Sequence, residues 1–420
     1  MNIIPALEMK GWRTSASDCT GNQIVVKYEF VSSETFKCRV CNRRMQRRGS
    51  RQLTVVDTPY MQYDIELQIE TPCLFCPHCS KYAVVRPQCI HPKRCMTLRL
   101  MGYIARLMQE TSARLLSKLL RLSQSSILRA DKDILTLLDE VRPICLDGRR
   151  ALIIDEKYLG RDKKFVTCVI DGSTGEILWL KEGKGTASLD GFFRSLTPEQ
   201  KEDIEVVSID RGNAYLKALR EHLPHVSISF DPFHIIKNVN DAVDEVRREQ
   251  CKSLEKEEKK LVKGKRYLFL CGEENLSDDK REELDKILQI NQPLQEAYLL
   301  KEKLRLVFQF SSFKKCATAF GEWIALAEAS TLKPFKRLAK TLSRHAQQVL
   351  NFFRFRLTSG RIEGMNSMIA RIQLKTRGLP SVDYLRLKLR QLTSPSFTRL
   401  FSYIPEKSSS LHYVNVRLKN

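Results

Sequence analysis

Two short cysteine motifs near the start of the chain constrain its folding more than any other feature. Both have the form C-x2-C, 34 residues separate them, and their thiols belong to Cys38, Cys41, Cys76 and Cys79. Four thiolates at this spacing can surround one Zn2+ tetrahedrally, as in a structural zinc ribbon. Residues 63–69 between the motifs alternate apolar and polar side chains, which is typical of a strand. The sequence therefore predicts a zinc-ribbon domain over residues 1–95, with Zn2+ contributing to its folding.

Other cysteines leave alternatives open. Cys73 has the same spacing to Cys76 and could replace Cys79 as the fourth ligand. A second ion could be held by Cys89, His91 and Cys95, although three ligands are one short of a closed structural site. The alternative to zinc is a set of buried free thiols. Thirteen cysteines are an odd number, and an intracellular chain of this length needs no disulfide framework.

The charge of the chain indicates a polyanionic partner. Lys and Arg number 71 against 49 Asp and Glu, which gives a net charge of +22 and favours nucleic acid or an acidic membrane surface. Residues 36–130 contain 17 basic and 5 acidic side chains, so this region is the first candidate for DNA contact. No uncharged apolar run reaches 18 residues and the opening lacks a secretory signal, so we expect a cytoplasmic, nucleoid-associated protein with no membrane partner.

Residues 96–147 have a helical pattern. The segments 112–121 and 124–135 indicate two short helices joined by a tight turn, with a serine cap opening the second. This is a helix-turn-helix candidate whose second helix would enter a major groove. An ordinary helical hairpin between two domains is the alternative.

The middle of the chain indicates an α/β sheet. Three short apolar or β-branched runs with turns between them predict antiparallel strands at 151–159, 163–171 and 176–183. A strand, an amphipathic helix and another strand follow at 204–210, 214–223 and 226–231. From 235 to about 355 the pattern is almost wholly helical.

Two aspartates end buried strands of this predicted sheet. Asp155 follows the apolar run 151–154, and Asp210 follows 206–209 on what would be a neighbouring strand. Adjacent carboxylates repel unless a cation lies between them, and divalent ions with oxygen ligands support phosphodiester chemistry. Glu363 is the best candidate for a third carboxylate, because it lies on a helix and shares a face with Asn366. The alternative is two aspartates that cap turns and a surface glutamate.

The ordered set of motifs resembles the ISL-three family of bacterial insertion-sequence transposases. The set comprises the two cysteine motifs, then Ile154-Asp155-Glu156, Ser208-Ile209-Asp210-Arg211, Asp231-Pro232-Phe233-His234-Ile235-Ile236-Lys237 and Ser359-Gly360-Arg361-Ile362-Glu363-Gly364-Met365-Asn366. The resemblance implies a DDE catalytic domain with a ribonuclease-H-like fold, in which Asp155, Asp210 and Glu363 bind Mg2+ or Mn2+, with two ions expected. It also implies a helical insertion between Asp210 and Glu363.

The resemblance extends to residues around the DNA. His234 is expected near the scissile phosphate as a contact or proton-transfer group, the alternative being a structural histidine where a strand meets a helix. Expected phosphate contacts are Arg43, Arg44, Arg47, Arg48, Lys237, Arg371, Lys375 and Arg377. Ordinary surface charge is the alternative for Lys237, Lys375 and Arg377. The family commonly continues with Ile-Lys after Asn366, whereas here Ala370 and Arg371 follow Ile369.

These inferences predict an ordered division of the chain. Its parts are the zinc ribbon (1–95), a helix-turn-helix-like region (96–147), the first part of the catalytic domain (148–240), a helical insertion (241–350), the last catalytic helices (351–395) and a tail (396–420). We expect a DDE transposase that binds terminal inverted repeats and target DNA, cleaves and joins strands, and works as a dimer or larger assembly. The alternatives are a catalytically silent DNA-binding regulator and a nuclease of the same fold.

Overall fold

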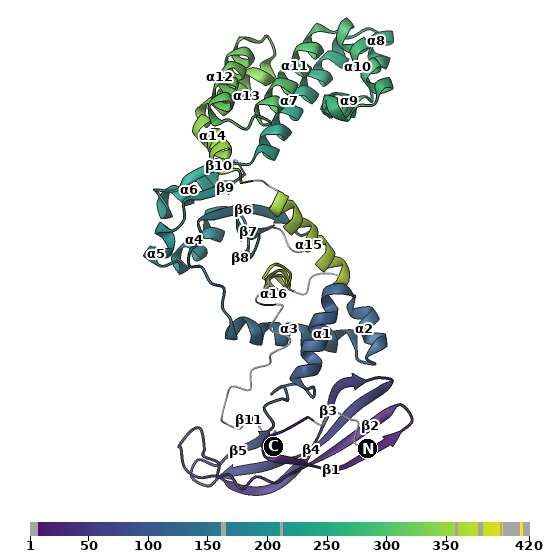
Figure 1. Cartoon of the computed structure of the whole chain (residues 1–420), viewed down its shortest axis with the longest axis vertical. Coiled ribbons are helices and arrows are strands. Elements are labelled where there is room, and N and C mark those ends of the chain that lie inside the picture. The colour runs from purple at the N-terminus through teal and green to yellow at the C-terminus, as the bar shows by residue number, and fades with distance from the viewer. Residues whose placement is uncertain are drawn as a thin grey trace. The chain divides into compact units, whose positions relative to one another are not determined.

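The computed structural model describes residues 7–160, 165–210, 213–357, 360–376, 381–394, 397 and 412–414. The chain forms two compact units (Figure 1). The first consists of Met1–Ile144 with Ile369–Asn420, and the second of Cys145–Met368. The helix α15 contributes residues to both units.

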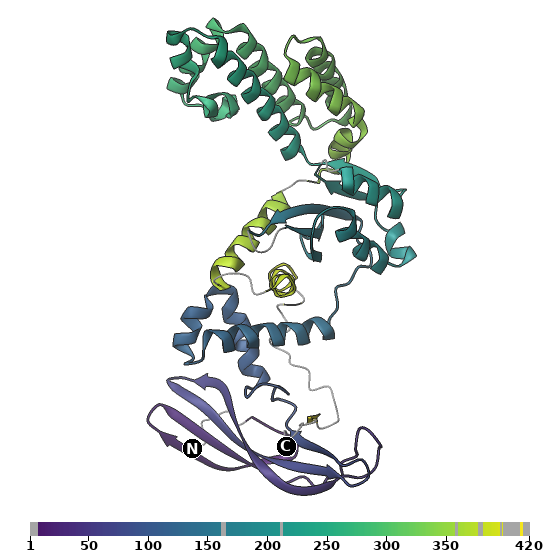
Figure 2. The ribbon, with the colours of Figure 1, turned by 180° about the vertical axis from the view of Figure 1, so that it is seen from behind.

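The first unit contains a six-stranded sheet that both views of the ribbon show as a twisted layer (Figures 1 and 2). Its strands are β1 (Trp12–Thr20), β2 (Gln23–Phe30), β3 (Gln46–Tyr60), β4 (Tyr63–Cys76), β5 (Lys81–Arg86) and β11 (His412–Val414). Their order is β1-β2-β4-β5-β11, and β3 also pairs with β4. Ile65, Leu67 and Ile69 on β4 are buried while their neighbours are partly exposed, which confirms the predicted strand alternation.

Helices of the first unit follow the sheet. They are α1 (Leu98–Glu110), α2 (Ala113–Leu119) and α3 (Gln124–Val141), and α16 (Val382–Thr393) joins them from the far end of the chain. The Ser123 hydroxyl accepts a hydrogen bond from the Ser126 N–H and caps α3. The predicted helical pair and its serine cap are therefore confirmed, and its role as a DNA-binding motif stays a prediction.

The helix α16 packs against α1 and α3, so one hydrophobic core combines residues from distant parts of the sequence. Tyr384 and Leu387 are buried together with apolar side chains of α1, α2 and α3. The Lys388 Nζ lies 3.1 Å from an Asp131 carboxylate oxygen, both side chains being buried. The sequence placed 351–395 with the catalytic domain, and periodicity alone gave no indication of this packing.

The second unit is built on a mixed five-stranded sheet. Its strands are β6 (Ala151–Tyr158), β7 (Phe165–Asp171), β8 (Ile177–Glu182), β9 (Val206–Ile209) and β10 (Ser227–Phe230), in the order β10-β9-β6-β7-β8. The strands β6, β7 and β8 pair antiparallel, whereas β9 and β10 run parallel to β6. This arrangement confirms the predicted three antiparallel strands followed by strand, helix and strand.

Helices complete the second unit. Those near the sheet are α4 (Thr186–Ser195), α5 (Pro198–Glu202), α6 (Asn213–His222) and α15 (Gly360–Thr376). The others are α7 (Pro232–Ser253), α8 (Lys256–Val262), α9 (Arg266–Leu270), the 3-10 turn Glu273–Asn275, α10 (Asp278–Ile290), α11 (Gln292–Val307), α12 (Phe313–Ala329), α13 (Lys333–Arg344) and α14 (Ala346–Phe355). Figure 1 shows α7 leading from the sheet into this helical group, where α11 packs against it. None of the helices in the described part of the chain is both long and apolar enough to cross a membrane.

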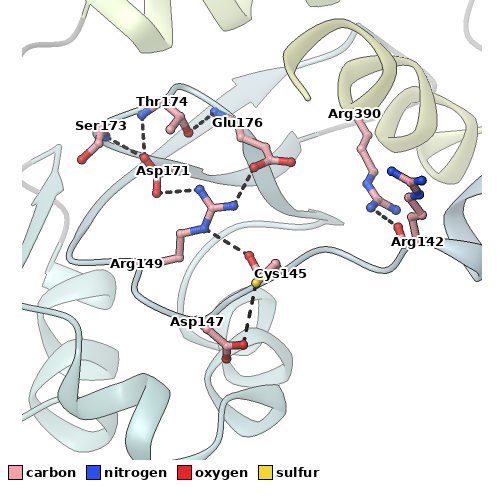
Figure 3. A network of polar contacts seen from close by, with 9 residues as sticks. All are labelled: Arg142, Cys145, Asp147, Arg149, Asp171, Ser173, Thr174, Glu176 and Arg390. Atoms are coloured by element: carbon pink, nitrogen blue, oxygen red, sulfur yellow. Dashed lines mark hydrogen bonds and ion pairs between the residues drawn. The ribbon is translucent and has the colours of Figure 1, made fainter. Parts of the chain in front are cut away.

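A polar network fixes the start of β6. The Arg149 guanidinium lies between Asp171 and Glu176, with N–O distances of 3.0 Å and 2.6 Å (Figure 3). The Asp171 carboxylate also accepts hydrogen bonds from the Ser173 and Thr174 N–H groups. Since Asp171 pairs with Leu152, this network ties the chain before β6 to the β7–β8 turn.

Candidate functional site

The four predicted zinc ligands meet at one point. The Cys38 and Cys79 sulfurs lie 3.4 Å apart, those of Cys41 and Cys76 lie 3.5 Å apart, and all four lie within 4.8 Å of one another. Zinc–thiolate bonds of about 2.3 Å place tetrahedral sulfurs about 3.8 Å apart. The donor type and spacing of this cluster therefore fit a Zn2+ ion.

The two cysteine motifs have matching backbone geometry. Asn42 and Ser80, which follow the last cysteine of each motif, adopt the left-handed conformation with φ of 56° and 51°. In the first motif, backbone N–H groups, above all that of Cys41, lower the pKa of Cys38 to about 6. The N–H of Cys79 likewise lowers the pKa of Cys76. Each knuckle thus stabilises the thiolate that a metal ion requires.

The alternative ligands do not join this cluster. Among the described residues, the four cysteines are the only group of three or more candidate metal ligands whose ligand atoms lie within 4.8 Å of one another. Cys73 is not part of this group. The His91 Nδ1 accepts hydrogen bonds from the backbone N–H groups of Lys93 and Arg94 at 3.2 Å and 3.1 Å. His91 therefore stabilises a turn, and a second ion at Cys89, His91 and Cys95 is not supported.

A row of three aspartates crosses the adjacent parallel strands β6, β9 and β10. Asp210 and Asp231 directly follow β9 and β10, whereas the prediction that Asp155 ends its strand is wrong, because β6 continues to Tyr158 by pairing with β7. In the sheet register, Ile154 on β6 pairs with Ile209 on β9, which pairs with Phe230 on β10. The next residue on each strand is an aspartate, namely Asp155, Asp210 and Asp231. The carboxyl ends of parallel strands form the usual site of ligand binding in α/β sheets. The sheet therefore gathers acidic groups at the edge where the sequence predicts catalysis.

The Asp155 carboxylate is partly buried and has a specific partner. The Asn366 side-chain amide on α15 lies 3.4 Å from its Oδ2. Burial raises the pKa of Asp155, and the charge of Asp210 adds to this effect, whereas Asn366 and His234 partly offset it. A bound cation would stabilise this carboxylate in its ionised form.

His234 lies between two carboxylates. Its Nδ1 is 3.1 Å from the Asp231 Oδ2, and its Nε2 is 3.4 Å from the Asp210 Oδ2. The hydrogen bond to Asp231 raises the pKa of His234, and the charges of Asp210 and Asp155 act in the same direction. Asp231 also caps α7 by accepting a hydrogen bond from the Phe233 N–H. One buried aspartate thus holds both the helix and the imidazole.

Glu363 lies in the first turn of α15 and its side chain is exposed. The structure brings Asp155, Asp210 and His234 together with Asn366, three residues beyond Glu363 on the same helix. The three predicted carboxylates do not form a group of ligand atoms within 4.8 Å of one another among the described residues. Gly364 leaves open space beside Glu363, since a Cβ there would meet no atom within 4 Å.

The predicted phosphate contacts differ in their surroundings. Arg43 and Arg44 are exposed, Arg47 pairs with Glu70 at 2.9 Å, and the Arg48 guanidinium lies 4.7 Å from the centre of the Phe75 ring. Lys237 and Arg371 are exposed. The Lys375 Nζ donates a hydrogen bond to the Gln109 carbonyl oxygen near the end of α1. Arg377 lies outside the described residues. All eight stay predictions.

Comparison with known proteins decides the family. A family model described as a transposase, that of the ISL-three DDE transposases, matches residues 152–389, more than half of the chain. The chain belongs to the ISL-three family of transposases. The transposase for insertion sequence element IS1001 of Bordetella parapertussis is 26% identical over 339 residues, covering 80% of this chain and 83% of that protein. The transposase for IS1557 of Mycobacterium tuberculosis is 28% identical over 251 residues, covering 54% of this chain and 56% of that protein.

Sequence reasoning named Asp231 in this transposase only as part of a motif. The structure shows it as the third aspartate of the row and as the hydrogen-bonding partner of His234. Its signal was present, because Asp231 is the last residue of the predicted strand 226–231, as Asp210 is of the predicted strand 204–210.

Proposed function

We propose that this transposase binds the terminal inverted repeats of an insertion sequence in the bacterial nucleoid and catalyses metal-dependent cleavage and strand transfer. The observation that carries the proposal is the aspartate row across β6, β9 and β10, with His234 and Asn366 beside it. The strand order, with three antiparallel and two parallel strands, is the one expected of a ribonuclease-H-like catalytic domain.

Asp155, Asp210 and Glu363 would hold two Mg2+ or Mn2+ ions, since hard divalent ions prefer carboxylate oxygens. Such ions activate an attacking hydroxyl and stabilise the leaving oxygen of a phosphodiester. The Asn366 amide orients Asp155. The raised pKa of His234 favours its protonated form, which can contact the scissile phosphate or donate a proton to the leaving oxygen.

Strand transfer requires two successive displacements at phosphorus. Water first cleaves the strand at the element end and leaves a 3′-hydroxyl, which then attacks a phosphodiester of target DNA. No covalent protein intermediate is needed. The first unit would hold the terminal repeat through the zinc ribbon and the α2–α3 pair, with Arg43, Arg44, Arg47 and Arg48 on phosphates. Joining two element ends favours a dimer or larger assembly.

A strand-transfer assay tests this proposal. Labelled duplex DNA carrying the terminal repeat is incubated with Mg2+ or Mn2+ and either the unchanged protein or Glu363→Gln. We expect metal-dependent joining by the unchanged protein and a loss of at least about 100-fold in the variant. Asp241→Asn, which changes an exposed carboxylate in the same unit, is the matched control and should join normally.

Glu363 is exposed and forms no cluster of ligand atoms with Asp155 and Asp210 among the described residues, which favours one alternative, a DNA-binding regulator without catalysis. If the unchanged protein binds the ends and joins none of them, this alternative replaces the transposase proposal. Equal joining by Glu363→Gln would remove Glu363 from the catalytic set.

A further inference from the structure

Positive charge is concentrated in one stretch of the helical group. Residues 241–328 carry 17 Lys and Arg against 18 Asp and Glu, so they are almost neutral. Residues 329–362 contain no acidic side chain, and their eight basic residues are Lys333, Lys336, Arg337, Lys340, Arg344, Arg354, Arg356 and Arg361. The stretch ends directly before Glu363. Its charge is therefore a local feature that the overall net charge does not explain.

Five of these basic residues form one exposed face of α13, which we call the α13 basic face: Lys333, Lys336, Arg337, Lys340 and Arg344. The opposite side of the helix is buried through Phe335, Leu338 and Leu342. The apolar side fixes how α13 packs and leaves the basic side to solvent.

The α13 basic face is unfavourable for the isolated helix. The first turn of α13 contains no acidic residue, although the N-terminal end of a helix favours negative charge. The pairs Lys333/Arg337, Lys336/Lys340 and Lys340/Arg344 place like charges four residues apart, where they repel. Arg337 pairs with Glu245 at 2.6 Å, whereas the other four basic residues make no ion pair among the described residues. A polyanion bound to this face would relieve the repulsion.

The α13 basic face is anchored to the candidate catalytic site. The Arg337–Glu245 pair joins α13 to α7, and α7 carries His234 near its start. Eleven residues separate His234 from Glu245, which is about 17 Å along a helix. The next helix, α14, contacts β10, where the Asn351 amide donates a hydrogen bond to the Ile228 carbonyl oxygen at 2.8 Å. The basic face is thus held within the unit that contains the aspartate row.

We propose that the α13 basic face binds the phosphate backbone of duplex DNA about five base pairs from the phosphate that reacts at the aspartate row. For a duplex that runs parallel to α7, the 17 Å along this helix and a rise of about 3.4 Å per base pair give this number. The five cations extend over about 16 Å of helix, a length that spans several phosphates of one strand. A second copy of this chain is a poor occupant, because its net charge of +22 would repel the face. This inference rests on the proposed function, which supplies DNA to the unit.

A salt titration of DNA binding tests the inference. The full chain is compared with the triple variant Lys333→Gln, Lys336→Gln, Lys340→Gln, using duplex DNA that contains the terminal repeat and ten flanking base pairs. The plot of log affinity against log salt has a negative slope, and each lost phosphate contact makes it shallower by about 0.9. We therefore expect the magnitude of the slope to decrease by about 2.7. Affinity at 0.1 M salt should fall by roughly two orders of magnitude.

The matched control is Lys280→Gln, Lys286→Gln, Lys303→Gln, which removes the same charge from exposed positions on α10 and α11. We expect its slope to stay near that of the unchanged chain, and circular dichroism should show both variants folded. Equal losses in the two variants would mean that only total charge matters, and an unchanged slope in the first would mean that α13 does not contact DNA. Either result overturns this inference and leaves the proposed function intact. If the unchanged chain bound no DNA, both would fail.

Phosphate ethylation of the same duplex locates the contact. Ethylation about five base pairs from the cleavage site should weaken binding of the unchanged chain and have no effect on the α13 variant. Interference that is identical for the two proteins at that position would contradict the placement. If the variant keeps its DNA affinity and instead loses binding to anionic vesicles or to an acidic protein, the surface serves another polyanion and the inference is wrong.

Discussion

The two candidate metal sites of this transposase differ in how completely the chain assembles them. Four thiols already lie within 4.8 Å of one another, whereas Asp155, Asp210 and Glu363 form no such group among the described residues. Neighbouring thiols can share protons. The pKa of Cys38 is lowered, whereas the hydrogen bond to Cys38 raises the pKa of Cys79 to about 12, so one thiol is ionised while the other stays protonated. Carboxylates are ionised at neutral pH and repel one another. The cysteine site is therefore preassembled, and we expect the proposed carboxylate site to close only around its ligand.

The largest expected effect comes from breaking the preassembled site. Cys76→Ser should lose bound zinc and destabilise the first unit by several kcal/mol, because metal binding contributes folding free energy. Zinc content by mass spectrometry and thermal unfolding measure this effect. Cys73→Ser is the matched control, and it should keep its zinc. Loss of zinc in both variants would return Cys73 to the ligand set.

Removing one carboxylate should abolish chemistry and leave the fold intact. We expect Asp155→Asn to lower strand transfer by about 100- to 1000-fold, since a neutral amide is a poor ligand for a hard divalent ion. Binding of the terminal repeat should change by less than about threefold, because the substitution leaves the proposed phosphate contacts of both units in place. Cleavage rate and a gel-shift titration measure the two effects. Cleavage at the normal rate would defeat the assignment of Asp155.

Metal addition tests whether the carboxylates come together only around an ion. If the carboxylates close only around an ion, Mn2+ at about 100 times its dissociation constant should stabilise the second unit by about 2.7 kcal/mol. Urea unfolding with and without Mn2+ measures this change, and Asp155→Asn should show little of it. Removal of Mn2+ with a chelator should reverse the effect. Equal stabilisation of the two proteins would place the ion elsewhere.

The smallest effect concerns pH. Burial raises the pKa of Asp155, so the folded state binds its proton more tightly than the unfolded state does. The associated stability is present below the unfolded pKa of about 3.9 and is lost as pH rises through the folded value. Metal-free Asp155→Asn should therefore be more stable than the unchanged protein at pH 7, by about 1 kcal/mol. The difference should vanish near pH 3, and an opposite sign would contradict the burial argument.

Local patterns predicted the local structure well. The apolar runs before Asp155 and Asp210 predicted the strands, and the spacing of Cys38 and Cys41 predicted a knuckle, because both depend on neighbouring residues. The pairing of Asp131 with Lys388 could not be predicted, since it joins residues far apart in the chain and periodicity carries no information on partners. The position of Glu363 relative to Asp155 was equally inaccessible, because it depends on how α15 packs. The spacing of Cys73 matched as well as that of Cys79. Pro77 favoured Cys79 from the sequence, and the fold brings Cys79 and not Cys73 into the cluster.

The packing of α16 onto α1 and α3 has a consequence for how the protein is made. Translation produces the sheet and helices of the first unit early, but Tyr384 and Leu387 leave the ribosome only after the second unit has been synthesised. Contacts between distant segments form late and slow folding. A nascent or prematurely terminated chain would therefore lack a complete core beneath its helical DNA-binding candidate. If these helices bind the element ends, as proposed, the ends would be bound chiefly by chains that also carry the proposed catalytic residues.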